Sequence, residues 1–178
     1  MKNYSVRLFL VGLAFLNACS KNDEIVETPQ QAKLDLLTTI SNSWDLYMYN
    51  ISTDREKYYF TGADLNRHSL HSLTFSKDGN YTSANTDWSG IYQFLNDSTQ
   101  IELTPTVPYF VSCVLNLDFI SADRIQFSSP SVQVNPERPG ASDYERFIAQ
   151  QGLNFLYDRG KDTTNLKSIK IEFKYTLR

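Results

Sequence analysis

Two cysteines and two histidines are the side chains of this 178-residue chain best suited to covalent or metal chemistry. Cys19 follows Leu16-Asn17-Ala18, so its thiol comes directly after a small residue at the end of an uncharged apolar run, residues 8–16. Basic residues precede this run, which is too short to span a bilayer as a helix and has the length of a signal-peptide core. Residues 1–18 are therefore predicted to be a signal peptide. The alternative for Cys19 is an incidental cysteine beside an ordinary secretory signal.

His68 and His71 have a spacing that puts two metal ligands on one face of a helical turn. Their surroundings are typical of a loop running into a strand, where residues three apart point to opposite faces. No third ligand is evident, and the acidic residues that could hydrolyse a glycoside lie mostly in turns or on polar strand faces, as solvated acids do. The sequence also lacks the motifs of serine hydrolases, zinc proteases and phosphate-binding loops. We expect no catalytic residue, no metal and no cofactor, and therefore a protein that is not an enzyme.

Cys113 lies in a segment whose alternation places it on one apolar face with Val111, Leu115, Leu117 and Phe119. A cysteine in such a place behaves as a small hydrophobic residue. We expect Cys113 to be buried in a core. No disulfide is expected, because the only other cysteine, Cys19, is a candidate for modification at the end of the leader.

Aromatic side chains are the remaining candidates for a binding site. The alternation predicts that six ligand-binding candidates point inward: Trp44, Phe75, Tyr81, Tyr92, Phe94 and Tyr109. Side chains fill barrels of about eight strands, so one alternative is that these rings only pack a core. The other is that some of them line a cavity for a small apolar ligand or a glycan. A second group, which includes Tyr49, is expected to face outward.

The elements that must position these residues are mostly strands. Three pairs of segments are predicted to form hairpins: 70–76 with 81–84, 90–95 with 100–104, and 109–120 with 124–128. Residues 166–177 alternate most clearly, and further strands are expected at residues 44–49 and 55–60. A short helix is expected at residues 32–41 and another at 143–151, with Ser142 as its N-cap and Gly152 as its stop.

These elements predict a mostly β fold, an antiparallel barrel of about eight strands with a short N-terminal helix and one late short helix. The expected organisation is a leader at residues 1–18, a flexible tether at 19–31 and one barrel domain at 32–178. Acidic residues outnumber basic ones, 20 to 17, and loss of the leader takes the formal net charge from −3 to −5. We therefore expect no nucleic-acid partner, because phosphate binding needs clustered Lys and Arg.

Leu16-Asn17-Ala18-Cys19 resembles a bacterial lipobox. The resemblance implies that Cys19 carries lipid, palmitate among the acyl chains, and that the membrane is a partner through this anchor. Two or more acyl chains hold a protein firmly, whereas one gives only marginal binding. The following Ser20-Lys21-Asn22-Asp23-Glu24 resembles the surface-export signal of Bacteroidetes lipoproteins, with Asn22 interrupting the acidic run. The implied location is the outer membrane, either surface-exposed or facing the periplasm.

Residues 34–128 resemble the lipocalin-like domain of Bacteroidetes lipoproteins. The segments that carry this are Ser43-Trp44-Asp45-Leu46, Leu73-Thr74-Phe75-Ser76-Lys77-Asp78-Gly79-Asn80-Tyr81, Trp88-Ser89-Gly90-Ile91-Tyr92-Gln93-Phe94 and Asp97-Ser98-Thr99-Gln100-Ile101-Glu102-Leu103. Asn42 stands where a Gly often precedes the Trp, and the stretch 130–164 has no counterpart in this pattern. Two short motifs resemble Bacteroidetes O-glycosylation sites, with Ser98 and Thr163 as acceptors.

The expected function is that of a membrane-anchored extracytoplasmic lipoprotein that binds a small apolar ligand or a glycan without catalysis. The alternative is a structural, accessory or inhibitory surface protein that acts through protein contacts and has a filled core. The sequence identifies neither the ligand nor any protein partner.

Overall fold

The computed structural model describes residues 28–38, 43–65, 68, 70–84, 86–108, 110–135 and 139–178. The predicted leader, Cys19 and most of the predicted tether lie outside the described residues, as does Tyr109. No helix in these ranges is long and apolar enough to cross a membrane.

Ten strands and two α-helices make up the described structure. The helices are α1 (Pro29–Leu37) and α2 (Asp143–Tyr157). The strands are β1 (Trp44–Thr53), β2 (Lys57–Thr61), β3 (Ser72–Phe75), β4 (Asn80–Ser83), β5 (Gly90–Leu95), β6 (Gln100–Pro105), β7 (Cys113–Ile120), β8 (Arg124–Ser128), β9 (Val132–Gln133) and β10 (Ser168–Leu177). Two short 3₁₀ turns, η1 (Gly62–Leu65) and η2 (Thr86–Trp88), lie in the connections.

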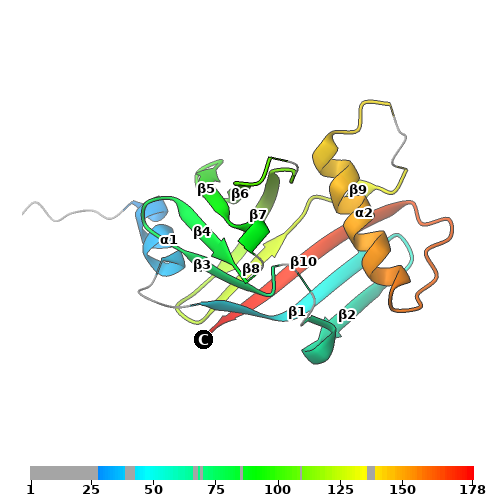
Figure 1. The fold of residues 1–178 in the computed structure, drawn as a ribbon, viewed down its shortest axis with the longest axis horizontal. Coiled ribbons are helices and arrows are strands. Elements are labelled where there is room, and N and C mark those ends of the chain that lie inside the picture. The colour runs from blue at the N-terminus through cyan, green and yellow to red at the C-terminus, as the bar shows by residue number, and fades with distance from the viewer. Residues whose placement is uncertain are drawn as a thin grey trace, which may run out of the picture.

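Eight of the strands close into an antiparallel barrel (Figure 1). The sheet runs in the order β2-β1-β3-β4-β5-β6-β7-β8-β10-β9, and β1 also pairs with β10 to complete the circle. The three predicted hairpins are present as β3–β4, β5–β6 and β7–β8. The predicted fold class, a mostly β barrel with one early and one late helix, is confirmed.

The first and last barrel strands continue beyond the barrel. Strand β1 pairs with β3 at Trp44 and Asp45 and then with β2 from Met48 to Ser52. Strand β10 also changes partner: its first residues, Ser168 and Ile169, pair with β9, and residues 172–176 pair with β8 in the barrel. The result is a four-stranded extension, β2-β1-β10-β9, and helix α2 packs against its β10 and β9 strands (Figure 1).

Helix α1 begins at Pro29, inside the range predicted as tether, and ends at Leu37, before the predicted residue 41. Thr28 caps the helix, because its side-chain hydroxyl accepts a hydrogen bond from the Gln31 backbone N–H (3.2 Å). Proline suits the first helical position, since a backbone N–H there would have no partner within the helix. The Lys33 ammonium donates to the Ser98 carbonyl in the β5–β6 turn (2.7 Å), and Leu37 accepts from the Trp44 indole N–H (3.0 Å). Helix α1 therefore covers the end of the barrel where the hairpin turns lie.

Helix α2 begins as predicted, with Ser142 and Glu145 forming a capping box. The predicted end at Gly152 is wrong, because the helix runs through this residue to Tyr157. A Cβ atom at position 152 would lie 2.4 Å from Cδ1 of Ile169 on β10. Glycine serves here to let the helix backbone approach the sheet.

Two β-bulges reverse the inward and outward faces that simple alternation predicts. The register of β1 against β10 shifts between Leu46 and Met48, and the register of β7 against β8 shifts between Leu117 and Phe119. As a result Tyr49, predicted to face outward, is 1% exposed, whereas Phe119, predicted to face inward, is 51% exposed. One extra residue moves every later side chain of a strand to the other face.

Candidate functional site

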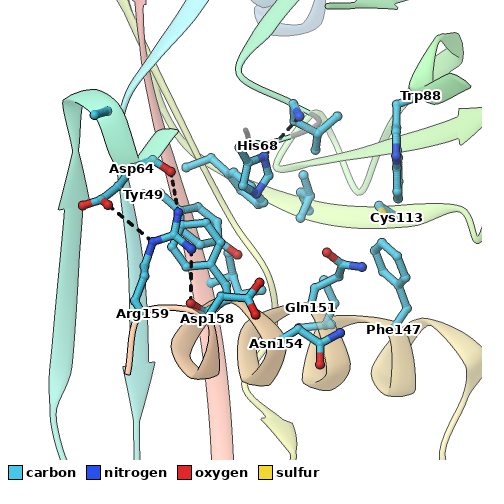
Figure 2. A pocket seen from close by; sticks show the side chains of 17 residues that line it. Tyr49, Asp64, His68, Trp88, Cys113, Phe147, Gln151, Asn154, Asp158 and Arg159 are labelled. Carbon is cyan, nitrogen blue, oxygen red and sulfur yellow. Dashed lines mark hydrogen bonds and ion pairs between the residues drawn. The ribbon is translucent and has the colours of Figure 1, made fainter. Parts of the chain in front are cut away.

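A cavity of about 780 Å³ lies between α2 and the barrel, at the opposite end from α1 (Figure 2). Its volume is in the range of small-molecule sites. The strands and loops contribute Tyr49, Ala63, Asp64, His68, Leu70, Trp88, Cys113, Leu115, Ile171 and Phe173. Helix α2 and the residues that follow it contribute Phe147, Ile148, Gln151, Asn154, Phe155, Asp158 and Arg159.

Aromatic rings line the cavity from both sides and hold α2 against the barrel. The Tyr49 ring centre lies 4.6 Å from that of Phe155 on α2 and 5.2 Å from that of Phe173 on β10. Further along the helix, Phe147 lies 5.3 Å from Trp88. Such contacts each contribute about 0.5–1.5 kcal/mol beyond the burial of area. The rings therefore fix the position of α2 and give the cavity an apolar floor.

Polar contacts fasten both ends of α2. The Tyr144 hydroxyl donates to the Val114 carbonyl (2.5 Å) near the start of the helix. Just after its end, Arg159 Nη2 donates to the Asp64 carbonyl (2.6 Å), and Arg159 Nε lies 3.6 Å from the Asp64 carboxylate. The guanidinium also stacks 3.4 Å from the Phe155 ring centre. The positive charge of Arg159 is thus balanced by Asp64 at the edge of the cavity.

His68 presents a neutral imidazole to the cavity. Its Nδ1 accepts a hydrogen bond from the Leu70 backbone N–H (3.1 Å), which leaves the proton of the neutral ring on Nε2. Burial among aromatic rings lowers the pKa of His68 to about 4, and the neighbouring His71 and Arg159 act in the same direction. The ring is therefore an uncharged hydrogen-bond donor at neutral pH.

His68 and His71 have the spacing of a metal-ligand pair, but their ring nitrogens are used locally. His71 Nδ1 lies 2.9 Å from the His68 carbonyl oxygen. Within the described ranges, no group of three or more His, Cys, Asp and Glu side chains could hold a metal ion.

Three polar side chains of α2 and its end, Gln151, Asn154 and Asp158, form the polar wall of the cavity. Their spacing of three and four places them on one helical face. All three are exposed, and none donates or accepts a side-chain hydrogen bond with any other described residue. In Figure 2, Gln151 points from the helix toward the space below His68 and beside Phe147. This wall offers both donors and acceptors to a ligand.

The five described ligand-binding candidates do not line this cavity. Trp44, Phe75, Tyr81 and Tyr92 are buried inside the barrel, and Phe94 is partly buried against them. Phe75 is central to this cluster, with its ring centre 5.2 Å from Tyr92 and 6.2 Å from Tyr81. Their packing corresponds to the core alternative for these rings.

Cys113 is 5% exposed, as its place on an apolar face predicts, and burial raises the pKa of its thiol to about 12. The thiol contributes to the cavity floor as a small apolar group. It is not the reactive thiolate that nucleophilic catalysis requires.

The two predicted glycosylation acceptors lie in different environments. Ser98 is 1% exposed, with a backbone φ of 63° in the β5–β6 turn, so its hydroxyl is shielded from a transferase in the folded domain. Thr163 is partly exposed in the connection between α2 and β10. Of the two, the folded domain presents only Thr163.

Sequence reasoning missed the cavity because its lining comes from segments distant along the chain. One local indication was present: Phe147, Gln151, Asn154 and Asp158 recur every three to four residues, as on one face of a helix. That face carries both an aromatic ring and polar side chains without hydrogen-bond partners among the described residues. No family model and no curated protein sequence matches this chain.

Proposed function

We propose that this protein is a non-catalytic, lipid-anchored binding module that holds a small apolar ligand or a glycan in the cavity between α2 and the barrel. The observation that carries the proposal is the composition of the cavity wall. Aromatic rings line the cavity from both sides, and the α2 side also carries Gln151, Asn154 and Asp158, polar side chains without a hydrogen-bond partner among the described residues. A binding site of this kind combines apolar area with a few polar groups that orient the ligand. The barrel interior is a packed core, so the proposal depends on the cavity of about 780 Å³ beside α2 and not on a hollow barrel.

We further propose that the chain is an outer-membrane lipoprotein of the Bacteroidetes type, acylated at Cys19. The support is the lipobox-like Leu16-Asn17-Ala18-Cys19 after an apolar leader. Replacing Cys19 by alanine should release the protein from the membrane fraction. A variant that still fractionates with membranes would show that this cysteine is not the anchor.

Binding is tested with N-phenyl-1-naphthylamine, a neutral aromatic dye that fluoresces strongly in apolar sites. The wild-type protein is expected to enhance its fluorescence in a saturable manner. Gln151→Phe should block the cavity and abolish this effect, because residue 151 points into it. Gln150→Phe is the matched control, since Gln150 is exposed on the same helix and does not line the cavity.

The outcome is decisive in both directions. Saturable binding that Gln151→Phe removes and Gln150→Phe retains supports the cavity as a ligand site. Equal dye binding by both variants would reject it and favour a protein that acts through its surface, as would a wild-type protein that binds neither the dye nor a glycan.

A further inference from the structure

We infer that the cavity takes a neutral, hydroxyl-bearing ring, such as a pyranose sugar, rather than an anionic amphiphile. This inference rests on the proposed function, because it assigns a ligand class to the same cavity. It follows from the charges on the cavity wall, from the mixture of donors and acceptors there, and from the arrangement of the aromatic rings.

The charges disfavour an anionic ligand. Arg159 is the cation of the described cavity lining, and its charge is offset by Asp64, with Nε 3.6 Å from the carboxylate. Two of its N–H groups already donate to the backbone carbonyls of Asp64 and Phe155. Asp158 adds a carboxylate without a partner among the described residues. A fatty acid or phosphate group would therefore meet a wall with an excess of negative charge.

The hydrogen-bonding groups favour a ligand that carries hydroxyl groups over a purely apolar molecule. His68 Nε2 is a donor, and the amides of Gln151 and Asn154 can both donate and accept. An apolar ligand would remove the amides of Gln151 and Asn154 from water without replacing their hydrogen bonds, which is costly. A hydroxyl group both donates and accepts, so it pairs with an amide, with a carboxylate and with an imidazole N–H.

The aromatic rings give the ring ligand a place to lie. Trp88 and Phe147 meet 5.3 Å apart at one end of the cavity, on the side toward which Gln151 points (Figure 2). A pyranose has an apolar face of C–H groups and an edge of hydroxyls. It would place that face beside the rings while its edge reaches Gln151, one helical turn from Phe147.

The probes for the test are the methyl glycosides of glucose, galactose and mannose, together with N-acetylglucosamine. Dodecanoate serves as the anionic comparator. Binding is measured by calorimetry and by saturation-transfer NMR on the full chain. We expect at least one of the sugars to bind, and to bind more tightly than dodecanoate.

One pair of variants connects binding to the polar wall. Gln151→Ala should weaken sugar binding about tenfold, which corresponds to about 1.4 kcal/mol. Gln150→Ala should leave it unchanged, because this exposed residue belongs to the same helix and does not line the cavity. Circular dichroism of each variant confirms that the fold is retained.

The results separate this inference from the proposed function. If the naphthylamine dye binds in the cavity and none of the sugars does, the cavity remains a ligand site and the sugar assignment fails. Tighter binding of dodecanoate, strengthened by Asp158→Ala, would assign an anionic amphiphile and overturn the inference. If neither dye nor sugar binds, both the inference and the proposed function are rejected.

Discussion

Replacing Gly152 by alanine tests whether the close approach of α2 to β10 holds the helix in place. Alanine is more favourable than glycine in a helix interior by about 1 kcal/mol, so helix propensity alone predicts a more stable variant. The new Cβ, however, would lie 2.4 Å from Ile169 Cδ1 and 3.2 Å from its Cγ1. Apolar carbon atoms pack best about 3.5–4.0 Å apart.

The steric clash between the new Cβ and Ile169 is expected to outweigh the gain in helix propensity. Ile169 is 0% exposed, so its side chain has little room to move. Overpacking a core costs about 1–3 kcal/mol, and the 2.4 Å contact calls for the upper part of this range. We expect Gly152→Ala to lower the free energy of unfolding by about 2 kcal/mol. For a domain of this size the melting temperature should fall by about 4–8 °C.

A double-mutant cycle with Ile169→Val identifies the cause. The valine lacks Cδ1, the atom in closest contact, and should cost about 0.5–1.5 kcal/mol by itself. The double variant should be at least about 1 kcal/mol more stable than the two single losses predict when added. Thermal and urea unfolding followed by circular dichroism measure all four proteins. A rise in melting temperature for Gly152→Ala, or strictly additive losses, would refute the argument.

Three further outcomes follow from the described contacts. Gly90→Ala should cost at least about 3 kcal/mol in urea unfolding, because its Cβ would lie 2.0 Å from the Thr104 carbonyl oxygen; a change below about 1 kcal/mol would contradict this. Burial lowers the pKa of His68 from 6.5 to about 4, so the unfolded chain binds a proton between these values that the folded protein does not. The free energy of unfolding should therefore decrease by up to about 3 kcal/mol as the pH falls from 6.5 to 4, and His68→Asn should remove this part of its pH dependence. Cys113, whose thiol pKa burial raises to about 12, should react with a thiol reagent at pH 8 only after denaturation; rapid labelling of the folded protein would show an open thiol.

Much of the barrel could be predicted from local sequence. Asp78-Gly79 marks the β3–β4 turn, and Gly79 adopts a φ of 83° there. The alternation over 166–177 identifies β10, because one face of this strand packs in the core and the other does not. Such features depend on neighbours within a few residues, so the sequence contains them directly.

The bulges and the cavity depend on contacts that are distant along the chain. Tyr49 turns inward because β1 shifts register against β10, and no local feature of residues 46–48 marks this shift. Gly152 has the residue type of a helix stop, and only the position of Ile169 shows that it serves close packing instead. The rings predicted to bind a ligand lie inside the barrel, whereas the cavity is formed where α2 packs on the barrel, a contact that the strand pattern does not include.

The two helices lie at opposite ends of the domain. Helix α1 bonds to the turns at one end of the barrel through Lys33 and Asp35, and α2 lies at the other end (Figure 1). If Cys19 carries lipid, the acyl chains join the protein ten residues before Pro29, and therefore at the α1 end, while the cavity lies beside α2 at the other end. A ligand would then enter the domain at a distance from the bilayer and not directly from the lipid.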